Sequence, residues 1–100
     1  MDKREAINKV KAYRKLLKGH LQFENMYLYG SYAKGTQKED SDIDVAIIVD
    51  HIDADFFVVR PLLWRLRRQI DDRIEPVLIE RDYDDAGFFG EVQKYGIKIA

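Results

Sequence analysis

The residues best suited to chemistry are a glycine–serine pair and, ten residues later, two aspartates. Gly30 and Ser31 follow an aromatic-rich segment, and Asp42 and Asp44 stand at the head of an apolar run. Alternate residues of a strand point to one face, so the two aspartates are predicted to project together. Like charges this close repel each other and favour a bound cation. Oxygen ligands with no His or Cys nearby indicate Mg²⁺ or Mn²⁺.

Gly30 and Ser31 are predicted to form a phosphate-binding turn. A strand that turns sharply into a helix presents backbone N–H groups and the positive end of the helix dipole to an anion. Glycine has no Cβ, so a phosphate can approach its backbone closely. The Ser31 hydroxyl can donate to a phosphate oxygen, and Lys34 is near enough in sequence to add positive charge. A triphosphate held here could extend toward metals at the two aspartates.

A third carboxylate would complete a two-metal arrangement, and Glu75 is the candidate. It begins a predicted strand, and Pro76 after it favours an extended backbone at Glu75. Pairing with a neighbouring strand would bring this carboxylate beside the aspartate pair. Asp71, Asp72 and Glu80 are also acidic and close in sequence, so they remain alternatives. Glu75 could also be only an exposed acid at the start of a strand.

The elements that must position these residues alternate between helix and strand. Strands are predicted at 26–29, 42–49 and 75–79, and helices at 2–18, 31–34, 56–70 and 85–95. Asp2 and Glu5 resemble a capping box at the first helix, and Asp53 is a candidate N-cap for the third. Pro61 lies inside the third helical pattern, so that helix either kinks there or begins near it. Alternating elements indicate a small sheet covered by helices.

Composition limits the classes of protein to consider. The chain has 100 residues, enough for one domain over residues 1–100. Its net charge of −1 gives no overall attraction to nucleic acid or anionic lipid. Without cysteine, neither disulfides nor thiolate chemistry is possible. Neither a signal peptide nor an apolar run of membrane-spanning length is evident, so a cytoplasmic protein is expected.

Two further groups of residues are predicted to be structural. A tryptophan and several arginines near the third helix would suit nucleic acid, but the apolar stripe of that helix favours a solvated outer face. This group is Trp64, Arg65, Arg67, Arg68 and Arg73. Aromatic and apolar residues of the last helix are predicted to pack in the core, although an exposed phenylalanine among them could mark a partner surface; they are Phe88, Phe89, Val92 and Tyr95. His20 and His51 lack the spacing of metal ligands and are expected in loops or at the surface.

Three segments together resemble the minimal nucleotidyltransferases, the smallest members of the polymerase-β-like nucleotidyltransferase superfamily. These are Leu-Tyr-Gly-Ser-Tyr-Ala-Lys-Gly-Thr at 28–36, Ser-Asp-Ile-Asp-Val-Ala-Ile-Ile-Val at 41–49 and Ile-Glu-Pro-Val-Leu-Ile at 74–79. The resemblance implies an α/β fold with a small mixed three-stranded sheet flanked by about four helices. It also implies ATP as the donor of a nucleoside monophosphate, with Mg²⁺ as cofactor.

The resemblance also assigns roles residue by residue. Gly30 and Ser31 would hold phosphate. Asp42 and Asp44 would bind metal, and Glu75 would be the third ligand or the general base. The family more usually has aspartate at this third position, and here a proline follows it.

Family members of this size are commonly encoded beside a small helical protein of the HEPN class. In such toxin–antitoxin pairs the nucleotidyltransferase is an antitoxin that adenylylates a tyrosine of its partner, a ribonuclease. The resemblance therefore implies a HEPN-type partner, and a chain of 100 residues leaves no length for a second domain that would hold the acceptor. Two alternatives remain: an antitoxin that binds its partner without catalysis, and a nucleotide-binding regulatory module.

Overall fold

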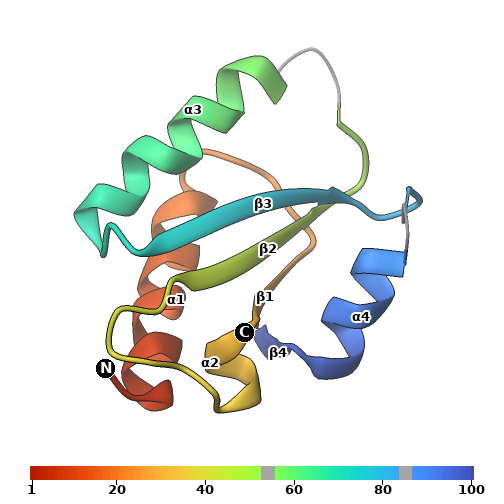
Figure 1. Ribbon diagram of the computed structural model, residues 1–100. Helices are drawn as coiled ribbons and strands as arrows, with labels where there is room; N and C mark the ends of the chain where they lie inside the picture. The colour runs from red at the N-terminus through yellow and green to blue at the C-terminus, as the bar shows by residue number, and fades with distance from the viewer. Residues whose placement is uncertain (53–55, 84–86) are drawn as a thin grey trace.

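The computed structural model of the protein describes residues 1–52, 56–83 and 87–100. Its helices are α1 (Lys3–Lys18), α2 (Ser31–Lys34), α3 (Phe56–Leu66) and α4 (Phe88–Tyr95), with a short 3-10 helix, η1 (Arg67–Gln69), after α3. Its strands are β1 (Asn25–Tyr29), β2 (Ile43–Val49), β3 (Ile74–Glu80) and β4 (Ile97–Ile99). Figure 1 shows the helices arranged around one twisted sheet.

Helix α1 begins and ends where local chemistry dictates. The Asp2 side chain accepts a hydrogen bond from the backbone N–H of Glu5 at 2.8 Å, which confirms the predicted N-cap. Gly19 follows the last helical residue. Between these ends, residues at helical spacing are buried against the sheet: Ala6, Val10, Tyr13 and Leu17. The apolar stripe read from the sequence is therefore the buried face of this helix.

The sheet has four strands in the order β3-β2-β1-β4. β1 pairs antiparallel with β2 and with β4, while β2 and β3 are parallel neighbours, so the predicted mixed sheet is confirmed. The predicted count of three strands was one short. The fourth strand, Ile97–Ile99, is only three residues long, too short to show an alternating pattern of apolar residues.

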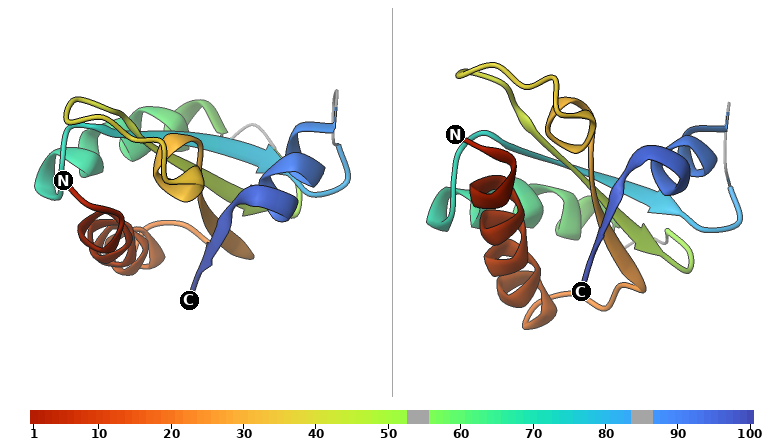
Figure 2. Two further views of the ribbon diagram at one scale, coloured as in Figure 1. Left: turned by 60° about the horizontal axis from the view of Figure 1, so that its bottom comes forward. Right: turned by 90° about the horizontal axis from the view of Figure 1, so that it is seen from below.

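Helices cover the two faces of the sheet unequally. Helices α1 and α3 lie on one face and α4 lies on the other, as the right-hand view of Figure 2 shows. The larger core joins α1 and α3 to one face of β1, β2 and β3, and a smaller core joins α4 to the opposite face. Because α4 is short, it covers only part of its face. The part it leaves open is where the candidate site lies.

The third and fourth helices differ from expectation in detail. Helix α3 runs through Pro61 without ending there. The candidate cap Asp53 lies outside the described residues, as does the predicted start of the last helix at residue 85. Within the described residues α4 begins at Phe88, and Phe89 and Val92 are buried as predicted.

Two residues of α4 were wrongly assigned to the core. The side chains of Phe88 and Tyr95 are 37% and 52% exposed. They flank the narrow buried stripe of a helix that contacts the sheet on one side only. Among the described residues, none of the helices combines the length and apolar character needed to cross a membrane.

Candidate active site

The pairing of three strands places Tyr29, Asp44 and Glu75 in one row across the sheet. Asp44 and Glu75 are predicted site residues, and Tyr29 is an additional one. Tyr29 of β1 is the partner of Asp44 on β2, and Asp44 is the partner of Glu75 on β3. Paired residues of neighbouring strands point to the same face of a sheet. This face is the one that α4 partly covers, since Ala46 and Ile48, which follow Asp44 at alternate positions, pack in the smaller core.

Gly30 brings the glycine–serine turn into contact with Asp44. Its backbone φ of 73° lies in the left-handed region that favours glycine. A Cβ built at Gly30 would overlap Oδ2 of Asp44, so the carboxylate lies directly against the turn. Gly30 also caps α2 without a side-chain acceptor. The turn and the carboxylate are therefore adjacent, as the sequence predicts.

The carboxyl groups of the site disfavour one another's ionisation. Burial, and then the charges of Glu75 and Asp42, raise the pKa of Asp44 to about 6. The pKa of Glu75 is also raised, by burial, by the charge of Asp42 and by a hydrogen bond between these two carboxyl groups. Arg67 acts in the opposite direction on Glu75. The structure thus brings together the three acids that the sequence singles out.

This donor set fits a hard divalent cation that arrives with a substrate. The pKa values of Asp44 and Glu75 are raised by burial and neighbouring charge, and a cation would relieve the repulsion between these carboxyl groups and Asp42. Within the described parts of the chain, no three His, Cys, Asp or Glu side chains are arranged as a ready metal cage. Mg²⁺ seldom needs one, because it is usually held by one or two carboxylates together with water and substrate phosphates.

The other predicted site residues lie around this row. Ser31 is the first residue of α2 and is half-buried, and Asp42 is exposed immediately before β2 begins. Lys34 ends α2 and is exposed, with Nζ 5.9 Å from the centre of the Tyr95 ring. Lys34 therefore lies at the junction of α2 and α4.

The alternatives to Glu75 as the third acid are engaged elsewhere or lie apart. Asp71 accepts hydrogen bonds from Lys9 and from Arg73. Glu80, at the other end of β3, accepts a hydrogen bond from the backbone of Ile52 at 2.9 Å. The side chain of Asp72 is exposed in the turn before β3. Glu75 is the acid that the strand pairing sets beside Asp44.

Tyr29 is a site residue that sequence reasoning missed. Burial, and then the charges of Asp44 and Glu75, raise its pKa to about 12. Its ring meets the edge of Phe88 on α4, with centroids 5.5 Å apart and planes at 79°. Tyr29 therefore links the carboxyl groups to α4. Only the strand register reveals this, because the sequence marks Tyr29 simply as one apolar residue of a short strand.

Arg67 was also missed, having been assigned to a solvated outer face. Its Nη1 donates to the backbone carbonyls of Asp72 at 2.7 Å and Ile74 at 2.9 Å. Its guanidinium also lies 4.4 Å from the centre of the Trp64 ring. Arg67 thus anchors η1 to the residues directly before Glu75. No spacing in the sequence indicates this contact.

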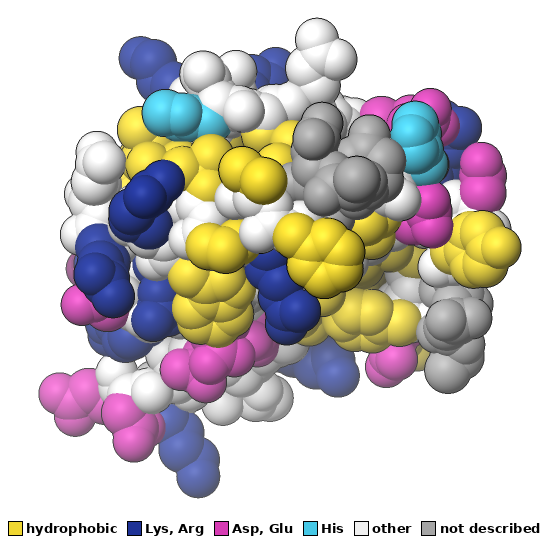
Figure 3. All heavy atoms as spheres, turned by 90° about the horizontal axis from the view of Figure 1, so that it is seen from above, with side chains coloured by type: hydrophobic (Ala, Val, Ile, Leu, Met, Phe, Trp, Pro, Cys, Tyr) yellow, Lys and Arg dark blue, Asp and Glu magenta, His cyan; other side chains and the backbone are white. Residues whose placement is uncertain are grey.

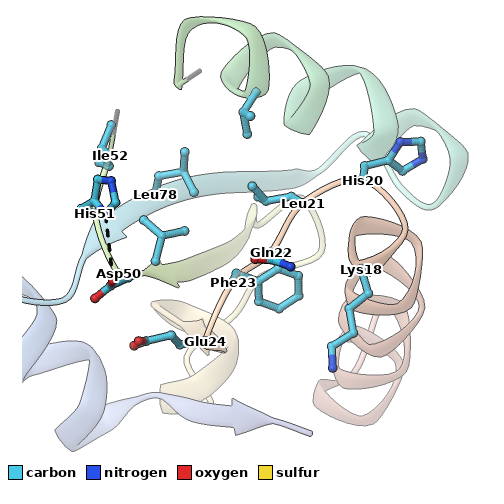
Figure 4. A pocket seen from close by; sticks show the side chains of 12 residues that line it. Lys18, His20, Leu21, Gln22, Phe23, Glu24, Asp50, His51, Ile52 and Leu78 are labelled. Atoms are coloured by element: carbon cyan, nitrogen blue, oxygen red, sulfur yellow. Dashed lines mark ion pairs between the residues drawn. The ribbon is translucent and has the colours of Figure 1, made fainter. Parts of the chain in front are cut away.

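A hollow of about 850 Å³ lies away from these residues, at the opposite end of β2. Figure 4 shows its lining, in which His20 and His51 stand on opposite sides. Both histidines are exposed, as expected for loop residues without metal-ligand spacing. None of the predicted site residues lines this hollow. The candidate active site is instead an open surface on the α4 side of the sheet.

Comparison with a protein-family model agrees with this arrangement. Residues 11–99 match the family described as polymerase beta nucleotidyltransferase. The match therefore spans the chain from the middle of α1 to the last strand, including the glycine–serine turn and the three acids.

Individual relatives agree with the family match. A Methanocaldococcus jannaschii protein named "Putative protein adenylyltransferase MJ0141" is 29% identical over 95% of this chain and 99% of its own length. A chain of a toxin–antitoxin crystal structure with AMP-PNP has a TM-score of 0.68 and 28% identity, covering 93% of this chain and 73% of that one. A chain from the crystal structure of a mutant of the toxin–antitoxin MntA-HpeT has a TM-score of 0.65 and 25% identity, covering 94% of this chain and 72% of that one.

A third structure supports the fold alone. It is described as a "putative nucleotidyltransferase from Sulfolobus solfataricus" and has a TM-score of 0.63 and 18% identity, covering 97% of this chain and 79% of that one. Taken with the row of carboxyl groups beside the glycine–serine turn, these matches show that the chain belongs to the polymerase-β nucleotidyltransferase family and is similar to the nucleotidyltransferases of MntA-type toxin–antitoxin pairs.

Proposed function

We propose that this protein transfers AMP from ATP to a hydroxyl group of a helical HEPN-type partner protein, and so acts as the antitoxin of a toxin–antitoxin pair. The observation that carries the proposal is the contact of Asp44 with Gly30, with Glu75 beside it on the next strand. The relative named as an adenylyltransferase supports the transfer of AMP, and the toxin–antitoxin structures support a protein partner.

The glycine–serine turn would hold the triphosphate. Gly30 leaves room for phosphate oxygens to approach the backbone, and Ser31 can donate its hydroxyl hydrogen to one of them. Lys34, at the end of the same short helix, would contribute positive charge. Charged and polar groups fixed before the nucleotide binds need little rearrangement during the reaction.

Asp42, Asp44 and Glu75 would hold Mg²⁺ together with phosphate oxygens of ATP. Their oxygen-only chemistry supports this choice of ion. A bound Mg²⁺ would supply Lewis-acid stabilisation of the negative charge that develops on the phosphate oxygens. Mn²⁺ has the same ligand preference and would substitute for it.

The order of the strands suggests how the reacting groups are arranged. Gly30 follows β1, Asp44 lies on β2 and Glu75 on β3, so the three occupy successive positions across the sheet. In-line displacement needs the attacking and leaving oxygens on opposite sides of the phosphorus. With diphosphate held at Gly30, the acceptor hydroxyl would approach from the β3 side.

The step itself forms one bond and breaks one. The acceptor oxygen bonds to the α-phosphorus as the bond from that phosphorus to the diphosphate oxygen breaks, and diphosphate leaves. Where Asp42 and Asp44 alone hold the ion, Glu75 would instead act as the general base that takes the proton of the acceptor hydroxyl. The products are the adenylylated partner and diphosphate.

Label transfer tests the proposal directly. The protein is incubated with ATP labelled at the α-phosphate, Mg²⁺ and a HEPN-type helical protein as the proposed partner, and label on the partner is measured after gel separation. We expect transfer by the unchanged protein and a loss of about 100-fold or more in Asp42→Asn and Asp44→Asn. Asp40→Asn removes an exposed acid of the preceding loop and serves as the control.

Two results would reject the proposal. Full transfer by Asp44→Asn would remove the assigned role of the carboxylate. Tight binding of the partner without any label transfer by the unchanged protein would instead favour an antitoxin that acts by binding alone.

A further inference from the structure

Helix α3 is apolar on two opposite sides. Its inner side packs into the larger core through Leu63 and Leu66, with Val59 and Leu62 partly buried. Its outer side carries a second apolar stripe at spacings of four and three residues, formed by Phe57, Pro61 and Trp64, and Arg68 of η1 follows four residues later. Residues at this spacing share one face of a helix. A helix that is apolar on both sides is normally buried on both.

The outer side of α3 is nevertheless open to solvent. The side chains of Phe57, Val58 and Trp64 are 81%, 74% and 37% exposed, and all three belong to this one helix. We call these residues, with Pro61, Arg65 and Arg68, the α3 outer stripe. Figure 3, which looks onto α3 and the outer edge of the sheet, shows hydrophobic and basic side chains interspersed over this region. Clustered exposed apolar side chains of this kind mark interaction sites.

The segment that carries the stripe has charges of one sign only. Residues 56–69 include four arginines and no acidic residue, although the whole chain has a net charge of −1. Arg67 is occupied with the ring of Trp64 and with backbone carbonyls, while Arg65 and Arg68 are exposed at the surface. A second copy of this chain would set arginines against arginines, which disfavours self-association. The complementary surface is apolar with acidic residues at its rim.

We propose that the α3 outer stripe docks a helix of the acceptor protein, one whose face carries apolar residues flanked by Asp or Glu. Apolar anchors on one helix and a groove or face on another are a common mode of recognition. Val58 and Pro61 offer neither ring stacking nor phosphate contacts, so they favour protein over nucleic acid as the occupant. This inference rests on the proposed function, because it identifies the occupant with the protein that receives AMP.

The position of the stripe suits delivery of an acceptor to the site. Helix α3 continues into η1, and Arg67 of η1 donates to the carbonyl of Ile74, the residue before Glu75. The stripe therefore ends next to the strand that carries the proposed general base. Helix α3 and the carboxyl groups lie on opposite faces of the sheet, and β3 is the edge strand between them. A partner docked along α3 would therefore extend around the β3 edge to present its acceptor hydroxyl, on the side from which in-line attack is expected.

Two pairs of substitutions test the docking surface. Phe57→Ser with Val58→Ser removes exposed apolar groups, and Arg65→Glu with Arg68→Glu reverses exposed charges, so neither pair disturbs the core. The matched controls are Tyr83→Ser, which removes a 71% exposed aromatic ring elsewhere, and Lys11→Glu with Lys15→Glu on α1. The probe is the same HEPN-type helical protein, titrated by calorimetry.

We expect each α3 pair to raise the Kd for this protein about tenfold or more, and the controls to leave it within about twofold. Binding of Mg²⁺–ATP stays unchanged in every variant. In the label-transfer assay the α3 variants raise the KM for the partner while kcat is retained at saturation. A merely structural role of α3 would lower kcat and ATP binding together.

The results that would overturn the docking surface differ from those that would reject AMP transfer. Unchanged partner affinity in the α3 pairs, equal losses in the controls, or no binding by the unchanged protein would overturn the docking surface. Partner binding that depends on the stripe without any label transfer would keep the surface and reject AMP transfer.

Binding of a single-stranded RNA that the α3 pairs abolish, with partner binding intact, would assign the stripe to nucleic acid and overturn the inference. A dimer of the chain alone that Phe57→Ser with Val58→Ser dissociates would assign it to self-association instead.

Discussion

Asp44 lies directly against Gly30, so that the carboxylate occupies the space into which any side chain at position 30 would project. The contact joins the end of β1 to the start of β2 on the open face of the sheet. It makes the glycine necessary for two separate reasons: the positive φ angle of its backbone and the proximity of an acid.

Substitution of Gly30 separates these two reasons. Gly30→Ala must move the Asp44 side chain and also adopt a strained φ, whereas Gly35→Ala has a similar φ of 76° and no atom within 4 Å of its Cβ. Gly35→Ala, whose ψ of 18° places it in the left-handed helical region, should lose about 1 kcal/mol of folding free energy. Gly30→Ala should lose about 2 kcal/mol or more, because its ψ of −148° makes a backbone conformation that is essentially restricted to glycine. Only Gly30→Ala should lose AMP transfer, by about 100-fold or more, in the label-transfer assay. Equal activity of the two variants would contradict the importance of the contact.

The stability of the protein should depend on pH through Asp44. Its pKa is about 6 in the folded protein and about 3.9 in the unfolded chain, so the folded state binds the extra proton between these values. The free energy of unfolding should therefore fall as pH rises from about 4 to about 6, and this loss should be absent in Asp44→Asn. Urea denaturation without metal or nucleotide measures it, with Asp40→Asn as the control that should follow the unchanged protein.

Asp71 should have the opposite effect. Hydrogen bonds from Arg73, and from Lys9, hold its pKa well below the usual range, and only 9% of its side chain is exposed. A depressed pKa contributes stability above about pH 4, and this is lost as pH falls through the folded-state value. Asp71→Asn should cost about 1–2 kcal/mol at pH 7 and much less at pH 2, by urea denaturation. Asp72→Asn, at the exposed neighbouring position, should change little at either pH.

Tyr13 connects α1 to α3 through a buried hydrogen bond. Its hydroxyl donates to the carbonyl oxygen of Leu63 at 2.8 Å, and burial raises its pKa far above the usual value. Tyr13→Phe leaves that buried carbonyl without this donor, so we expect a loss of about 1–2 kcal/mol in the free energy of unfolding. Tyr83→Phe, at an exposed position, should be neutral. A Tyr13→Phe protein as stable as the unchanged one would show that another donor replaces the hydroxyl.

Local patterns in the sequence predicted most of the fold. The Asp2 cap, the stripe of α1 and the glycines after β1 and α2 act over a few residues, so they can be read directly. The strand at Ile97–Ile99 could not, because three residues hold no period and their pairing with β1 is a long-range contact. Phe88 and Tyr95 were misplaced for a related reason: an apolar residue does not reveal how much of a helix its neighbours cover.

The site was predictable in its acids but not in its supporting residues. Asp42 immediately precedes β2 and Asp44 lies on it, and their spacing of two residues in a predicted strand is enough to predict that they point the same way. The placement of Glu75 beside Asp44 depends on the register of two parallel strands, which no local pattern fixes. Tyr29 and Arg67 depend on contacts with α4 and with the turn before β3, and these exist only in the folded chain.

The parallel pairing of β2 and β3 has a consequence for the order in which the site forms during folding. Parallel neighbours cannot be joined by a hairpin, so residues 50–73 must cross over and dock before Glu75 meets Asp44. Contacts between such distant segments form late and slowly. A nascent chain would display the glycine–serine turn and the aspartates well before it gained the third acid. Capture of metal-bound ATP would then report that folding is complete.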